Sequence, residues 1–158
     1  MDIIKIVDEL DKRGYYKTTI DFYGEERAVA FSKSDDDDHL TEKHKATLEH
    51  FNNLWTAEFQ LELLHSIIKY YKEKEYGWYG PADEKEEWSP EIDTPEQMLE
   101  QLIFDRIILP PDFLYEDEVI FLTFSHKWGH DMEYEDNGIG VEICNGKINN
   151  IGYKDIAY

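Results

Sequence analysis

A long segment without glycine or proline, residues 40–75, constrains the fold of this chain most. Apolar side chains recur in it every three or four positions, which is the spacing of one face of an α-helix. The stripe consists of Leu48, Phe51, Trp55, Phe59, Leu63, Ile67 and Tyr70, widened by Leu61, Leu64, Ile68 and Tyr71. The segment therefore predicts a long buried helix, with a break near Asn52-Asn53.

The residues before this helix predict a shorter helix and a β-hairpin. Residues 2–13 carry apolar side chains at helical spacing, and Gly14 follows as a C-cap. From residue 15 to 34, apolar and polar side chains alternate on both sides of Gly24-Glu25-Glu26, as in two strands joined by a turn. The run Asp35–Asp38 then suits the positive N-terminal end of the long helix.

The residues after the long helix predict a short helix and a β-meander. The helix starts at Thr94-Pro95, and its buried face consists of Met98, Leu99, Leu102 and Ile103. A strand end is predicted at 107–109, and 119–128 is apolar on both faces, as in a central strand. Asn137-Gly138 and Asn145-Gly146 are type I′ turn signals. We expect a single α+β domain over residues 1–158: an antiparallel sheet of about six strands, with one long and one or two short helices packed on it.

Charge limits the classes of partner. The chain has 36 acidic and 16 basic residues, a net charge of −20, and is 15% aromatic, so a folded body carries a strongly negative surface. Such a surface repels nucleic acids and anionic membranes and attracts a basic protein. The single cysteine, Cys144, and the acidic residues within the first ten positions predict a cytoplasmic protein without a signal peptide.

The C-terminal region resembles a family of small uncharacterised bacterial domains. Trp128, then Glu135-Asp136-Asn137-Gly138-Ile139-Gly140-Val141, then Asn145-Gly146-Lys147 are similar to that family's Trp-Asp-x-Glu-His-Gly-x-Gly hairpin and the Gly-Lys turn after it. Asn137 stands where the family has histidine, and the tryptophan lies farther from the glutamate. The resemblance implies an immunity or accessory protein of a bacterial toxin system, and it implies no chemistry or catalytic residue.

Several residues are candidate metal ligands or catalytic groups. His126, His130 and Asp131 could ligate zinc, but their spacing suits a helix and they lie at a predicted strand end. The clusters Asp35–Asp38 and Asp131, Glu133, Glu135, Asp136 do not match a calcium loop. Cys144 has no basic neighbour that would activate it, so we expect a buried small side chain. We therefore expect no metal, no cofactor and no catalytic residue.

The segment 76–93 is the predicted partner-binding region. Exposed aromatic side chains next to carboxylates are typical of a surface that anchors a basic partner. The candidate residues are Tyr76, Trp78, Tyr79, Trp88, Glu84, Glu86 and Glu87, with Glu133, Glu135 and Asp136 of the acidic hairpin. The alternative is that the tryptophans form a lid over the long helix.

Two functions follow from these patterns. The leading hypothesis is an acidic interaction protein of the cytoplasm, such as an immunity-type inhibitor of a basic toxin or a nucleic-acid-binding enzyme. The alternative is a small enzyme or ligand-binding module with a pocket between helix and sheet that uses His126, His130 and nearby acids.

Overall fold

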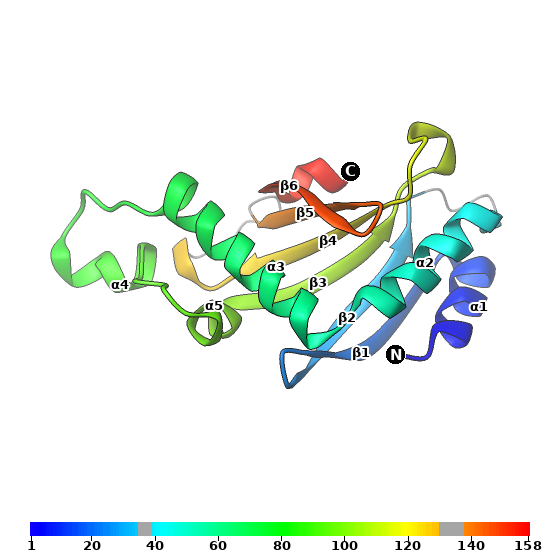
Figure 1. Ribbon diagram of the computed structural model, residues 1–158. Coiled ribbons are helices and arrows are strands. Elements are labelled where there is room, and N and C mark those ends of the chain that lie inside the picture. The colour runs from blue at the N-terminus through cyan, green and yellow to red at the C-terminus, as the bar shows by residue number, and fades with distance from the viewer. Residues whose placement is uncertain (35–38, 130–137) are drawn as a thin grey trace.

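A six-stranded, mostly antiparallel sheet with helices on one face forms the fold, in the computed structural model of the chain (Figure 1). The structure describes residues 1–34, 39–129 and 138–158. The strands follow one another across the sheet in sequence order: β1 (Tyr15–Phe22), β2 (Glu25–Lys33), β3 (Leu102–Leu109), β4 (Val119–His126), β5 (Ile139–Cys144) and β6 (Lys147–Tyr153). The predicted α+β domain is confirmed, and β4 is an interior strand as its two apolar faces indicated.

Five α-helices and several shorter helical turns accompany the sheet in the described chain. The helices are α1 (Ile3–Arg13), α2 (Glu42–Leu54), α3 (Ala57–Tyr70), α4 (Lys85–Trp88) and α5 (Pro95–Gln101). A π-helical turn, η1 (Tyr71–Glu75), continues α3, and 3₁₀ turns are η2 (Ala82–Glu84), η3 (Asp112–Leu114) and η5 (Lys154–Ala157). None of the helices within the described residues has both the length and the apolarity that a membrane crossing requires.

The predicted long helix is two helices. Asn52-Asn53 lie inside α2, and the break comes at Trp55 and Thr56. Thr56 is the N-cap of α3, because its side chain accepts a hydrogen bond from the amide of Phe59 at 3.2 Å. The indole N–H of Trp55 donates to the carbonyl of Asp21 on β1 at 2.7 Å, which attaches the break to the sheet.

Two other boundaries differ from the prediction. The hairpin turn is Tyr23-Gly24, both with positive φ, and the two glutamates that follow belong to β2. Helix α5 ends at Gln101, and Leu102 and Ile103 begin β3 instead of completing the helix, because they pair with β4. Asn145-Gly146 forms the predicted turn, with φ values of 49° and 78°. The predictions for Asp35–Asp38 and for Asn137 lie outside the described residues.

All neighbouring strands are antiparallel except β2 and β3. The chain leaves the sheet after β2, forms α2 to α5, and returns as β3 beside β2 in the same direction. The parallel register runs from Ala30 opposite Arg106 to Lys33 opposite Leu109. Because both strands point the same way, their carboxyl ends lie at one edge of the sheet.

The core lies between the helices and one face of the sheet. Side chains of α1, α2, α3 and α5 form a single cluster with alternate residues of the strands. An aromatic group centres it: Phe104 lies 4.5 Å from Phe124 and 5.9 Å from Trp55, between ring centres. On the opposite face, η5 and the end of the chain cover a smaller apolar cluster around Ile108 and Phe121.

Candidate partner-binding arm and the cavities at the sheet edge

Residues 76–93, here called the arm, project from one end of the sheet beyond α3 and α5 (Figure 1). The arm contains η2 and α4 and leads back to the N-cap of α5. The predicted residues Tyr76, Trp78, Tyr79, Trp88, Glu84, Glu86 and Glu87 all lie in it. The fold therefore presents these aromatic and acidic side chains on one structural element.

Contacts of Tyr71 and Trp128, both buried, hold the base of the arm. Tyr71 is fully buried, and its hydroxyl donates to the carbonyl of Pro90 at 2.6 Å, which ties the start of the arm to its end. Trp128, which follows β4, packs edge-on against Tyr71 with 4.8 Å between ring centres. The indole N–H of Trp128 donates to Glu75 Oε2 at 2.9 Å. Burial raises the pKa of Tyr71 to about 12, so its hydroxyl keeps its proton.

Contacts within the arm define its shape. The amide of Gly77 donates to Ser89 Oγ at 2.9 Å, across the neck of the arm. Lys85 Nζ lies 3.0 Å from both the hydroxyl of Tyr76 and Glu91 Oε1, and these hydrogen bonds raise the pKa of the lysine. The Tyr76 hydroxyl also donates to Glu91, and this hydrogen bond, together with that from Lys85, lowers the pKa of the Glu91 carboxyl. These contacts link the start of the arm to its end.

The two tryptophans of the arm stack on each other. Their ring centres are 5.7 Å apart and their planes differ by 5°. The indole N–H of Trp78 donates to the carbonyl of Pro81 at 2.7 Å, inside the arm. The stack is not part of the core cluster that contains α3, and Trp88 remains 38% exposed. The pair therefore organises the arm itself more than it covers the long helical segment.

Exposed groups surround this stack. Tyr79 is fully exposed, and Tyr76 is 39% exposed. Asp83, Glu84 and Glu86 are exposed and form no ion pair with the described residues, whereas Asp93 pairs with Lys72 at 2.5 Å. The arm thus offers aromatic surface beside three carboxylates, those of Asp83, Glu84 and Glu86, that have no ion-pair partner in the described part of the chain.

His126 lies inside the protein. It is 7% exposed and stacks on Trp128 with 3.7 Å between ring centres. Its Nδ1 donates to the carbonyl of Trp128 at 2.9 Å, and its Nε2 is 3.9 Å from Glu75 Oε2. Burial lowers the pKa of His126 to about 4, although the carbonyl opposes this shift. The fold therefore uses this imidazole in its neutral form, as a packing group at the base of the arm.

The remaining candidates are distributed as follows. His130, Asp131, Glu133, Glu135 and Asp136 lie outside the described residues, as do Asp35–Asp38. Among the residues that the structure describes, no group of three histidine, cysteine or carboxylate side chains is placed to hold a metal ion.

Cys144 differs slightly from expectation. It is half-buried instead of buried, because β5 places it near the edge of the smaller apolar cluster. Burial and the neighbouring carboxylate of Asp117 raise the pKa of the thiol, which keeps it protonated.

The sequence patterns did not predict the residues whose hydrogen bonds hold the arm. Glu75 and Ser89 have the composition of surface loop residues, and nothing local shows that they bond to Trp128 and Gly77. Trp128 carried a signal as part of the C-terminal motif, but its partner lies 53 positions earlier.

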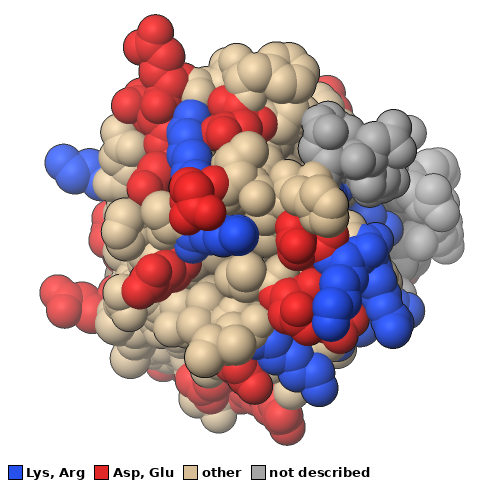
Figure 2. Space-filling view, turned by 90° about the vertical axis from the view of Figure 1, so that its right-hand side faces the viewer, with Lys and Arg blue, Asp and Glu red and all other residues tan. Residues whose placement is uncertain are grey.

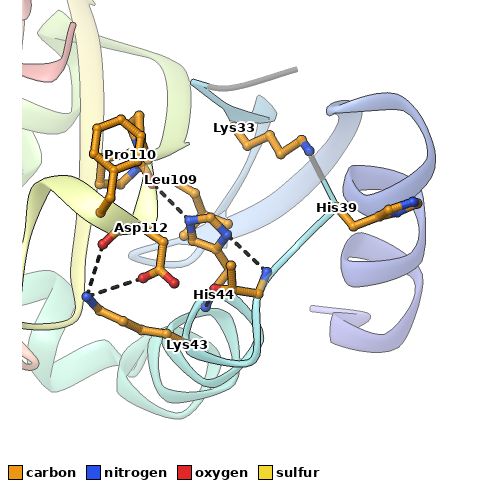
Figure 3. A pocket seen from close by; sticks show the side chains of 10 residues that line it. Lys33, His39, Lys43, His44, Leu109, Pro110 and Asp112 are labelled. Atoms are coloured by element: carbon orange, nitrogen blue, oxygen red, sulfur yellow. Dashed lines mark hydrogen bonds and ion pairs between the residues drawn. The ribbon is translucent and has the colours of Figure 1, made fainter. Parts of the chain in front are cut away.

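Two adjoining cavities lie at the other end of the molecule, where β2 and β3 end. The smaller, about 420 Å³, lies between the start of α2 and the Pro110-Pro111 turn (Figure 3). In it, Nδ1 of His44 accepts from the amide of Thr41 at 3.3 Å, so its Nε2–H donates to the carbonyl of Pro110 at 2.9 Å. Lys43 pairs with Asp112 at 3.2 Å. The larger cavity, about 570 Å³, shares Lys33 and the two prolines.

Comparison with known proteins gives one family. A family model described as "Domain of unknown function (DUF6985)" matches residues 6–158. No curated protein and no solved structure matches the chain.

Proposed function

The chain belongs to the DUF6985 family, whose description specifies no activity, and we propose from its geometry that it binds a basic protein partner through the arm. The observation that carries this proposal is the combination of exposed aromatic rings and exposed carboxylates on an internally bonded projection. Aromatic side chains supply contact area at low entropic cost, and the carboxylates supply charge complementarity.

The distribution of charge suggests that long-range attraction and partner selection depend on different parts of the surface. Figure 2 shows acidic side chains spread over the face that lies at the right of Figure 1, with basic side chains next to acidic ones. A net charge of −20 attracts any basic protein from a distance. Net charge alone does not distinguish one basic protein from another. The aromatic rings of the arm supply specific contacts, so the arm is the element that would select one partner.

An immunity-type inhibitor fits this arrangement. A toxin or other enzyme that acts on nucleic acid carries a positive patch for phosphate, and an acidic surface can cover that patch. The contacts at the neck of the arm reduce the entropy lost on binding, because the binding surface is ordered in advance. We propose that the protein acts in the cytoplasm, in a non-catalytic role.

An arginine peptide tests the proposal. Binding of a deca-arginine peptide should be followed by tryptophan fluorescence and by calorimetry, since guanidinium groups both pair with carboxylates and stack on aromatic rings. Replacing Trp78 and Tyr79 with alanine should weaken binding about fivefold or more, from about 1 kcal/mol of lost cation–π contact. The melting temperature should change little, because both side chains lie outside the core.

Matched controls separate the arm from the overall charge. Phe113→Ala with Tyr153→Ala removes two exposed rings elsewhere and should leave affinity unchanged. Asp83→Asn, Glu84→Gln and Glu86→Gln should weaken binding more than Glu49→Gln, Glu58→Gln and Glu62→Gln, which remove the same charge from α2 and α3. Equal losses in the two triple variants would show that the arm has no special part in binding.

A further inference from the structure

Exposed apolar and aromatic side chains gather around the larger cavity at the carboxyl ends of β2 and β3. Tyr15 at the start of β1, Leu114 in η3 and Tyr158 at the end of the chain all line this cavity and are exposed. Phe113, beside Leu114 in η3, is 81% exposed. Contiguous exposed surface of this kind is uncommon on a monomeric soluble protein and is typical of a site of protein contact. This end of the molecule, opposite the arm, therefore has the features of a second interface.

Phe113 and Leu114, here called the loop tip, lie in the segment between β3 and β4, which projects beyond the end of the sheet (Figure 1). Nζ of Lys43 on α2 donates to the backbone carbonyls of Asp112 and Tyr115, one on each side of the tip. The same ammonium pairs with Oδ1 of Asp112 at 3.2 Å. The backbone around the tip is therefore bonded to α2 at both of its ends, while its two apolar side chains stay exposed.

The loop tip lies directly beside the larger cavity. Leu114 lines this cavity and Phe113 lines the smaller one, so the tip lies between the two. Ile108 and Phe121 of the smaller apolar cluster form the floor of the larger cavity on the outer face of the sheet. Its volume of about 570 Å³ is in the range of sites that hold small organic ligands, so it can take the apolar side chains of one loop tip. An apolar projection and an apolar hollow thus adjoin on one surface.

The charges beside the tip and beside the cavity are of opposite sign. Arg106 lines the cavity, and the register of the sheet places it on the outer face, with the cavity floor. Its guanidinium carbon is 5.9 Å from the centre of the Tyr15 ring. Shortly after the tip come two exposed acidic residues, Glu116 and Asp117. A guanidinium can bind a carboxylate through two parallel hydrogen bonds, so an acidic segment next to an apolar tip complements an arginine next to an apolar cavity.

We propose that two copies of the chain associate through this end of the molecule, with the loop tip of each copy in the larger cavity of the other. Because the tip borders the cavity, one two-fold axis beside Leu114 makes both contacts at once, and such a contact closes as a dimer. Glu116 and Asp117 of each copy then face Arg106 of the other. A second copy fits better than a different protein, because this one surface supplies both halves of the contact. The arm takes no part, so the proposal does not depend on the function proposed for the arm.

Analytical ultracentrifugation of the full chain tests the association. The measurement belongs in about 150 mM salt, where a screening length of about 8 Å limits the general repulsion between two chains that each carry a net charge of −20. The sedimentation coefficient should rise with protein concentration from that of a monomer to that of a dimer. A monomer at every concentration would overturn the proposal. Growth beyond the dimer would show head-to-tail association and would overturn the two-fold arrangement.

Substitution of the loop tip locates the interface. Phe113→Ser with Leu114→Ser should weaken the association about tenfold or more, because the apolar area that the tip buries in the other copy is lost. The melting temperature should change little, since both side chains are exposed in the monomer. Ile4→Ser with Tyr153→Ser removes two exposed side chains elsewhere and should leave the association unchanged. An equal loss in this control would overturn the proposal.

A charge exchange tests the pairing between the copies. Arg106→Glu should weaken the association, and so should Glu116→Lys with Asp117→Lys, because each places like charges together at both contacts of the dimer. An equimolar mixture of the two variants should associate again, since every cavity then faces a segment of opposite charge. If Arg106→Glu lowers the melting temperature strongly, Arg13→Glu at the exposed rim of the same cavity takes its place. A mixture that associates no better than its two components would overturn the proposal.

Two further measurements separate this interface from other charged surfaces. Asp35–Asp38 follow Ser34, which lines the same cavity, and replacing all four with asparagine should not weaken the association. A loss would assign the contact to this acidic run instead of Glu116 and Asp117, and the proposal would be wrong. The loop-tip variant should bind the arginine peptide as the wild-type chain does, so the two proposals can fail independently.

Discussion

At the scale of single residues, burial decides the chemistry of His126. The imidazole stacks on Trp128, and its Nδ1–H is used by a backbone carbonyl. Glu75 is 3.9 Å from the other ring nitrogen, and a carboxylate at that distance would favour the charged form, yet burial outweighs it and lowers the pKa to about 4. The neutral ring is therefore part of what joins β4 to the base of the arm.

This lowered pKa predicts a pH dependence of stability. Above pH 6.5, the ordinary pKa of histidine, the ring is neutral in both the folded and the unfolded chain. Between pH 6.5 and about 4 only the unfolded chain takes up the proton, so the free energy of unfolding falls as pH falls, by on the order of 2 to 3 kcal/mol in total. Urea denaturation at a series of pH values measures this fall.

Two variants isolate the contribution of His126. His126→Gln should flatten the dependence between pH 6.5 and 4 relative to the wild-type chain. His65→Gln, at an exposed position of α3, should leave the dependence as it is. If both variants show the wild-type slope, the slope belongs to carboxylates and not to the buried imidazole.

At the scale of elements, the helix ends that depend on nearby residues were predicted correctly, whereas the pairing of strands was not. Gly14 ends α1 in the left-handed conformation, and Thr94 and Gln97 form the predicted capping box, because these interactions involve residues close in sequence. Leu102 has helical spacing with Met98, but its pairing with His126 on β4 makes it a strand residue. That partner is 24 positions away, so no local pattern could show it.

The arm and the larger cavity show the same difference between local and long-range information. The composition of 76–93 identified an exposed aromatic and acidic segment, whereas the bonds from Tyr71 and Trp128 that hold it are long-range. The larger cavity at the ends of β2 and β3 was not predicted. Its lining includes Lys33 of β2 and Arg106 of β3, two strands that only the parallel pairing brings together. The sequence held one signal for the burial of Lys33, which continues the alternation of the core residues Val29 and Phe31.

The packing of α3 predicts a large cost for truncating its buried face. Leu63 has no exposed surface, and Phe59 is 5% exposed. Leu63→Ala and Phe59→Ala should each lower the free energy of unfolding by about 2 to 5 kcal/mol, because the emptied space cannot collapse fully. Ile4→Ala removes a similar side chain from an 81% exposed position on α1 and should cost less than about 0.5 kcal/mol. Chemical denaturation that gave Leu63→Ala a cost as small as that of Ile4→Ala would contradict this assignment of the core.

At the scale of the whole molecule, like charges oppose folding. A net charge of −20 on a chain of 158 residues produces repulsion that is stronger in the compact state than in the unfolded chain. Local ion pairs such as Lys12–Asp8 and Lys85–Glu91 relieve it only in part, since exposed pairs contribute little. Screening should therefore stabilise the protein.

The melting temperature should rise as sodium chloride is increased from about 10 to about 300 mM, over which the screening length shortens several-fold. Differential scanning calorimetry measures the change. A variant with Glu49→Lys, Glu58→Lys and Glu62→Lys, three exposed positions on α2 and α3, should show a smaller response. A melting temperature that falls with salt would mean that attractive ion pairs dominate the electrostatics of the folded state.

The single parallel contact between β2 and β3 also sets an order of assembly. The other strand pairs within 1–34 and 102–129 join neighbours in sequence, whereas the parallel ladder joins Lys33 to Leu109 across 76 positions. Closing that span costs about 2 to 3 kcal/mol more chain entropy than closing a hairpin, so its formation is slow unless both sides are already structured. We expect the N-terminal hairpin and the C-terminal meander to form first and to dock through this ladder. The larger cavity at its end would then be among the last features of the chain to appear during folding.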